Sequence, residues 1–160
     1  MSTIYDVPTS IKDYLDGNRV RYMVLPHRRD YSAQRTAADT FTPGREFAKP
    51  VLLWVDNYYA LAVLPADKKI DFGKLRDTLA AAEAGLARES EIRWLFPDCE
   101  CGAEPPFGNL YGIPVLVAAE LADDETITFN GGTHEDVIRM KYADFERLVD
   151  PAVLDFACKA

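Results

Sequence analysis

Two apolar runs, VLLWV at residues 51–55 and YYALAVL at residues 58–64, decide the fold of this chain. Asp56 and Asn57 separate them, and a two-residue polar break between such runs is typical of a β-hairpin. Runs that are continuously apolar, rather than alternating, indicate strands buried on both faces. The sequence therefore predicts a hairpin with two largely buried strands.

Shorter elements flank this hairpin. Upstream, a helix capped by Ser10 runs to Leu15, residues 19–25 form a strand that Pro26 ends, and Ser32 opens a helix over 32–38. Downstream, Asp71 and Ser90 are the expected caps of two helices, the second closed by Pro97. The remaining predicted elements are strands over 113–118, 126–129 and 137–140, and a closing helix over 143–149.

The order of these elements predicts the fold class. Hairpins and helices follow one another without the regular βαβ alternation of a doubly wound sheet. We expect an α+β fold with a mixed, mostly antiparallel β-sheet or partial barrel flanked by helices. A chain of 160 residues suits one domain, so we assign residues 1–160 to a single unit.

Charge and composition limit the function classes. The formal net charge is −8, so the chain repels nucleic acid on average and any RNA must be met at a small positive site. No apolar run approaches the roughly 20 residues of a membrane helix. The first residues lack a basic stretch followed by an apolar run, so we expect no secretory signal and a cytoplasmic protein.

Lys49 is the first candidate for chemistry. It precedes Pro50 at the mouth of the most apolar strand, where one ammonium could lie over a pocket floored by the hairpin. A point charge in that position suits a phosphate or a developing oxyanion. The alternative is a strand-end lysine that simply reaches solvent.

A loop rich in glycine and proline is the second candidate. Gly102 and Gly108 bound a segment that contains Pro105, Pro106 and Phe107. Glycines let backbone N–H groups approach a ligand closely, and prolines stiffen a loop without needing donors. Such a backbone could bind an anion or an ester carbonyl. The alternative is a purely structural Ω-type loop.

The segment Asn130-Gly131-Gly132-Thr133-His134 is the third candidate. The two glycines predict a hairpin turn, and His134 beyond it could act as a polar contact or an acid–base group. A surface histidine beside a turn is the alternative.

Several other chemistries lack support. The three cysteines, Cys99, Cys101 and Cys158, are an odd number that argues against a disulfide framework. Cys99 and Cys101 have no second ligand pair at zinc spacing, and the sequence contains no Walker loop, dinucleotide fingerprint or nucleophile elbow. We therefore expect no metal and no cofactor.

Taken together, three segments resemble the YbaK family. They are Ala48-Lys49 before an apolar strand, the Gly102-x-x-x-Pro106 loop and Gly131-Gly132-Thr133-His134, in this order. The family includes free-standing aminoacyl-tRNA deacylases and the editing insertion of bacterial prolyl-tRNA synthetases. Pro50 departs from the pattern, since some deacylases carry a polar residue there.

The resemblance implies hydrolysis of the ester between an amino acid and the terminal adenosine of a mischarged tRNA, without metal or covalent nucleophile. It implies that Lys49 and Gly102 are the catalytic positions. We assign substrate binding to the second group of residues: His134, Gly132, Thr133, Pro106, Phe107 and Gly108. The implied partners are the 3′ end of a mischarged tRNA and an aminoacyl-tRNA synthetase, with no membrane and no DNA.

Two alternatives from other classes stay open. One is a non-catalytic module that binds an aminoacyl-adenosine or an amino acid in the same cleft. The other is a hydrolase of a different small ester, which Lys49 and the loop would serve equally well.

Overall fold

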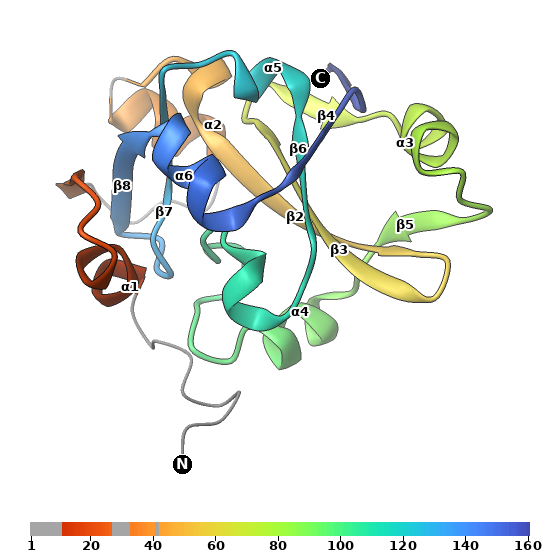
Figure 1. Ribbon diagram of the computed structural model, residues 1–160, viewed down its shortest axis with the longest axis horizontal. Helices are drawn as coiled ribbons and strands as arrows, with labels where there is room; N and C mark the ends of the chain where they lie inside the picture. The colour runs from red at the N-terminus through yellow and green to blue at the C-terminus, as the bar shows by residue number, and fades with distance from the viewer. Residues whose placement is uncertain (1–10, 27–32, 41) are drawn as a thin grey trace.

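The computed structural model describes residues 11–26, 33–40 and 42–160. Within these ranges the strands form three sheets, with orders β1-β8-β7, β10-β4 and β5-β2-β3-β6-β9 (Figure 1). The strands are β1 (Tyr22–Pro26), β2 (Ala48–Val55), β3 (Tyr58–Pro65), β4 (Lys68–Ile70), β5 (Ala84–Leu86), β6 (Val115–Ala118), β7 (Thr126–Asn130), β8 (Asp136–Lys141), β9 (Ala152–Leu154) and β10 (Ala157–Lys159).

The predicted hairpin is confirmed as β2 and β3. Their register runs from Val55 opposite Tyr58 to Ala48 opposite Pro65, so β2 begins three residues before its apolar run and β3 ends one residue after its own. Asp56 turns the chain with a φ of 51°, a left-handed value that aspartate tolerates better than most residues. In Figure 1 this hairpin runs diagonally through the molecule.

The strand pairings confirm the α+β class. The pairings of β3 with β6 and of β6 with β9 are parallel, and the other five among the described residues are antiparallel. The strands are divided among three sheets instead of lying in a single one. A parallel bridge from Phe47 to Thr128 joins the three-stranded sheet to the start of β2.

Helices cover the sheets on several sides. They are α1 (Ile11–Gly17), α2 (Ala33–Asp39), α3 (Phe72–Leu79), α4 (Glu89–Leu95), α5 (Ala119–Ala122) and α6 (Tyr142–Val149), with 3-10 turns η1 (Gly44–Glu46) and η2 (Gly108–Tyr111). None of the helices in the described ranges is long and apolar enough to cross a membrane.

The helix caps test the sequence prediction in detail. Asp71 is confirmed as the cap of α3, because its side chain accepts the N–H of Lys74. Ser90 is wrong as the cap of α4: Arg88 holds that position, and Glu91 binds back to its backbone N–H. The caps expected at Ser10 and Ser32 lie outside the described residues.

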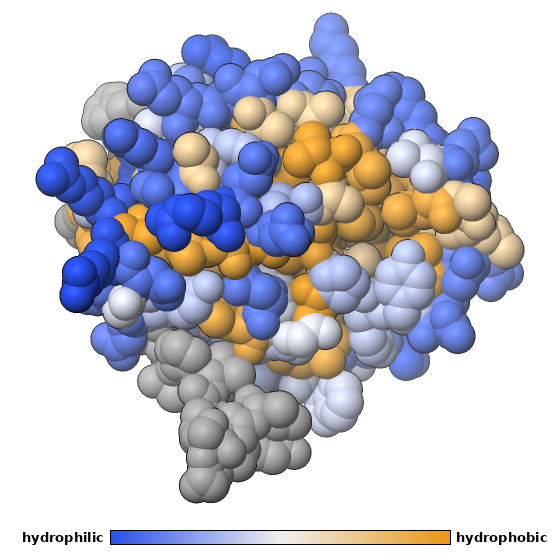
Figure 2. Space-filling model, viewed as in Figure 1, coloured by the Kyte–Doolittle hydropathy of each residue, from blue (hydrophilic) through white to orange (hydrophobic). Residues whose placement is uncertain are grey.

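The central hairpin separates two apolar clusters. Ala48, Leu52, Leu61 and Val63 belong to the cluster that also contains Phe107 and Phe129. Their neighbours along the strands face a second cluster built on Leu75 and Phe156. This two-sided burial accounts for the continuous apolar runs. On the face in Figure 2, apolar surface lies across the middle, between hydrophilic margins.

Candidate active site

A loop and a hairpin turn, far apart in sequence, are hydrogen bonded to each other. The N–H of Glu100 donates to the carbonyl of Gly132 at 2.8 Å, and the N–H of Gly132 donates to the carbonyl of Ala103 at 2.9 Å. These two bonds hold the loop after α4 against the turn between β7 and β8. Two of the three predicted segments are therefore brought together.

Gly102 and His134 meet at the centre of this contact. A Cβ on Gly102 would lie 3.4 Å from Cε1 of His134, and the φ of Gly102 is +90°. The left-handed backbone favours glycine here, and a Cβ would be in van der Waals contact with the imidazole. The His134 side chain is only 4% exposed, and its Nε2 lies 2.9 Å from the carbonyl oxygen of Cys101. His134 is thus part of the loop's internal packing rather than a surface residue.

Two carboxylates complete the cluster. Oε1 of Glu100 accepts the N–H of His134 at 2.7 Å, and Oε2 of Glu104 accepts the N–H of Gly102 at 2.9 Å. Glu104 is 2% exposed, and burial raises its pKa, although backbone N–H groups and His134 oppose this shift. The sequence analysis missed both residues. In the sequence they could have been recognised as two acidic residues within a loop rich in glycine and proline.

The bond to Glu104 changes the role that Gly102 can play. Its N–H already has a charged acceptor, so it cannot also donate to an oxyanion while this bond is made. The expected oxyanion contact from the Gly102 N–H therefore requires the Glu104 carboxylate to move away. Lys49 is the other predicted donor.

Lys49 is half-buried at the start of β2. Its Nζ donates to the carbonyl of Ala66 at 3.4 Å, which also accepts the Gln34 amide at 3.2 Å. Burial lowers the pKa of Lys49, and the charge of Asp67 partly opposes this. No carboxylate in the described ranges lies within ion-pair distance of Nζ, so this ammonium keeps donors for a further acceptor.

The parallel bridge relates Lys49 to the turn. Phe47 pairs with Thr128, and Lys49 and Asn130 each follow two residues later, so both continue towards the Gly131–His134 turn. Among the described residues, no hydrogen bond or ion pair joins Lys49 to Gly102 or to His134. The structure thus gathers Gly102, Gly132 and His134, while Lys49 lies on β2 and hydrogen bonds the carbonyl of Ala66.

The second half of the predicted loop belongs to the core. Phe107 is fully buried, with ring contacts to Tyr14, Phe129 and Phe145. Pro106 and Gly108 are also buried, and a Cβ on Gly108 would lie 2.5 Å from the carbonyl oxygen of Ile113. The sequence assigned these three residues to substrate binding. In the structure all three are buried, so their side chains pack within the protein, and their assignment to substrate binding stays a prediction.

Thr133 shapes the turn. Its hydroxyl donates to Oδ2 of Asp136 at 2.9 Å and accepts the N–H of Asp136 at 3.0 Å. Thr133 and Gly132 also line a cavity of about 160 Å³ beside the cluster, together with Cys99 and Tyr111. Its lining combines polar and apolar side chains.

The cysteines are poor nucleophiles in this environment. Burial raises the pKa of Cys99 to about 12, and its thiol contacts the Tyr111 hydroxyl. Burial also raises the pKa of Cys101, which the charge of Arg93 opposes. Both thiols therefore stay protonated at neutral pH. The described residues hold no group of three or more His, Cys, Asp or Glu arranged to bind a metal ion.

The residues of this site lie in a segment that matches a known protein family. Residues 27–148, more than half of the chain, match the aminoacyl-tRNA editing domain family, and the chain belongs to it. The match includes Lys49, Gly102 and His134, and the resemblance to the YbaK and prolyl-tRNA synthetase editing proteins is confirmed.

A particular relative is the multifunctional Ser/Thr-tRNA deacylase ProXp-y of Escherichia coli strain K12. It is 32% identical over 102 residues, which are 62% of this chain and 60% of the relative. The same protein of Escherichia coli O157:H7 matches equally. The chain thus aligns with about three fifths of the length of these relatives.

Solved structures share the fold. A hypothetical protein named APE2540 superposes with a TM-score of 0.81 at 16% identity, covering 92% of this chain and 99% of that one. A candidate trans-editing enzyme for prolyl tRNA synthetase superposes with a TM-score of 0.79 at 18% identity, covering 100% and 99%.

Proposed function

We propose that this chain is an aminoacyl-tRNA deacylase that hydrolyses the ester of a mischarged tRNA. The observation that carries the proposal is a half-buried ammonium with unused donors, Lys49, in a chain of the editing family. It lies on β2, whose start is bridged to β7, the strand that leads into the turn with Gly132 and His134. Because an aminoacyl ester is already activated, modest electrostatic stabilisation is enough to accelerate its hydrolysis.

In this proposal Lys49 binds a negatively charged group of the substrate. Its ammonium would bind the terminal phosphate or the oxyanion that forms when water attacks the ester carbonyl. One preorganised donor of this kind contributes about 2.7–4 kcal/mol to transition-state stabilisation. Partial burial strengthens the interaction, because water competes less for the ammonium.

The loop supplies the second part of the scheme. Gly102 is exposed, whereas residues 103–108 after it are buried, and its missing side chain leaves the backbone open to the ester. Glu104 holds the Gly102 N–H until a substrate displaces it, and this carboxylate could then accept a proton from the attacking water. Burial favours this role, because it raises the pKa of Glu104 towards the working pH.

The amino acid removed is a small one in this proposal. The cavity beside the cluster, about 160 Å³, has room for a side chain of the size of alanine, serine or threonine, and we propose that it selects such small residues. The name of the ProXp-y relative, a Ser/Thr-tRNA deacylase, agrees with this size. The partners are the tRNA 3′ end and a synthetase that delivers it, in the cytoplasm.

One observation favours a second candidate, a non-catalytic module that binds an aminoacyl-adenosine. The N–H groups of Gly102 and Gly132 are both paired within the protein, so neither stands ready as an oxyanion donor. A module that only binds would keep these bonds during its function.

Single-turnover deacylation separates the two functions. Purified protein is mixed with tRNAs carrying alanine, serine, threonine or a correct large residue, and the release of amino acid is followed. We expect release of the small residues only, with Cys99→Ser and Cys101→Ser as active as wild type. If no mischarged tRNA loses its amino acid, the binding module replaces our proposal.

A further inference from the structure

Trp94 is an unusual residue for its place in the fold. It lies on the two-turn helix α4, and its side chain is 75% exposed, the highest value among the large hydrophobic residues described. Ile92 and Leu95 of the same helix pack against the core, and Glu91 binds the Tyr59 hydroxyl. The helix is therefore fixed in place with Trp94 in solvent, where a polar residue is the rule.

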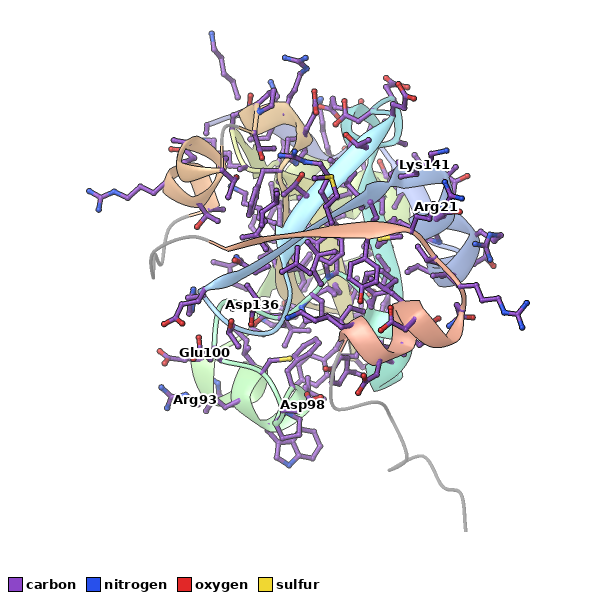
Figure 3. All side chains as sticks on the ribbon, turned by 90° about the vertical axis from the view of Figure 1, so that its left-hand side faces the viewer. Arg21, Arg93, Asp98, Glu100, Asp136 and Lys141 are labelled. Atoms are coloured by element: carbon purple, nitrogen blue, oxygen red, sulfur yellow. The ribbon has the colours of Figure 1, made fainter. Side chains whose placement is uncertain are left out.

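The loop of Gly102 begins shortly after α4 ends at Leu95. The charge of Arg93 acts on the thiol of Cys101, and the carbonyl of Cys101 contacts Nε2 of His134. Figure 3 shows Arg93, Asp98 and Glu100 in the same part of the molecule, below Asp136. Trp94 is thus next in sequence to a residue whose charge acts on the loop of Gly102.

The charge of the chain makes such a residue necessary. A net charge of −8 gives little attraction for phosphates, and Asp98 and Glu100 add negative charge at this end of the molecule. An acidic protein that binds the end of an RNA needs contacts that do not depend on charge. Stacking of a base on an aromatic ring is such a contact, and it tolerates any base.

We propose that Trp94 stacks on an unpaired base of the tRNA 3′ end, next to the adenosine that carries the amino acid. This inference rests on the proposed function and adds a residue that binds the RNA rather than the ester. The acidic surroundings orient the strand, with its bases towards α4 and its phosphates towards solvent.

Kinetics on two substrates test the proposal. Wild type, Trp94→Ala, Trp94→Phe and the control Tyr58→Ala are compared on mischarged tRNA and on the matching aminoacyl-adenosine, which lacks the preceding nucleotides. Tyr58 is a suitable control because it is also an exposed aromatic, 44%, but stands at the turn of the β2–β3 hairpin.

We expect Trp94→Ala to raise KM for tRNA about 5- to 100-fold, the range for loss of one stacked base, with little change in kcat. Trp94→Phe should keep most of the affinity, and Tyr58→Ala all of it. On aminoacyl-adenosine all four proteins should be equal. An unchanged KM of Trp94→Ala for tRNA would overturn the proposal, as would an equal loss on both substrates.

Fluorescence tests binding without turnover. A short single-stranded RNA ending in CCA should quench the emission of the wild type, and the same RNA with abasic positions before the terminal adenosine should not. Trp94→Phe should lose the quenching. This reading remains valid if no ester is hydrolysed, so failure of the proposed function and failure of stacking are distinguishable. Binding of a synthetase that depends on Trp94, without RNA quenching, would mark a protein-docking residue and contradict stacking.

Discussion

Lys49 combines a charge with partial burial, two properties that oppose each other in a folded protein. Its hydrophobic neighbours along β2 continue into the core, and its ammonium has a carbonyl, not a carboxylate, as partner. Such a group disfavours folding and is tolerated where function requires it. The lysine is therefore the first residue to substitute.

Lys49→Met separates function from folding. Methionine keeps the length of the side chain and removes the charge, so single-turnover deacylation should fall by roughly 10²–10³-fold, the scale of one lost electrostatic contact. The melting temperature should not fall, because a half-buried charge is removed. Calorimetry on the same preparation is the control. A variant as active as wild type would exclude Lys49 from the site.

The pH dependence of the reaction gives a second measure of Lys49. Burial lowers its pKa below 10.5, so the ammonium is present at low pH and is lost as the pH rises through the lowered value. The ratio of the catalysed rate to the uncatalysed rate should therefore fall as the pH rises through this lowered pKa. Lys49→Arg should keep its charge to higher pH, because guanidinium does not deprotonate there. Identical alkaline limbs would assign the decline to another group.

The free energy of unfolding should rise with pH, whereas the activity falls. Between the lowered pKa of Lys49 and 10.5 the unfolded state binds more protons than the folded one, so this residue makes stability rise with pH in that window.

At the scale of elements, the loop from residue 98 to η2 has one half that serves the site and one half that serves the core. Gly102 is exposed, whereas Pro106, Phe107 and Gly108 are buried. The buried half anchors the exposed half, because Phe107 packs among three other rings. Changes in the buried half should therefore act through stability.

Gly108→Ala tests that anchor. The new Cβ would lie 2.5 Å from the Ile113 carbonyl oxygen and 2.8 Å from the Val115 Cγ2, so the backbone must shift. We expect a loss of about 1–3 kcal/mol, the cost of overpacking, seen as a lower midpoint in urea. Gly17→Ala is the matched control, since nothing lies within 4 Å of its Cβ position. Equal midpoints for both variants would contradict this packing.

Elements with strong local signals could be predicted from the sequence. The β2–β3 hairpin, the Asp71 cap and the closing helix each rest on patterns of adjacent residues. The three-residue strands β4, β5, β9 and β10 could not be predicted, because their pairing partners alone define them. Burial of Phe107 and the Glu104 bond likewise depend on segments distant in sequence.

The candidate site follows the same division. Glycine pairs and a lysine before an apolar strand could be recognised in the sequence as unusual. The contact between Gly102 and His134 could not, since it depends on how the loop docks on the turn. The sequence also gave no reason to separate Pro106, Phe107 and Gly108 from Gly102, because the side on which a loop residue packs has no periodicity.

For the whole molecule, charge is the property that matters for tRNA. Each phosphate neutralised by a protein adds a slope of roughly −0.7 to the dependence of log affinity on log salt for a single strand. With Lys49 as the proposed phosphate contact, we expect a slope near −1 or shallower. Titration of KM from low to high salt measures it. A slope of several units would reveal a basic surface that this account lacks.

Two neighbouring hydrogen bonds join the loop to the turn. The N–H of Glu100 donates to Gly132, and the N–H of Gly132 donates to Ala103. Separation of the loop breaks both at once, so deuterium exchange of the two amide protons should give one common opening free energy. That free energy would measure how readily the loop opens, without substrate. A ligand that closes the site would slow both amides together and leave the amides of β10 unchanged.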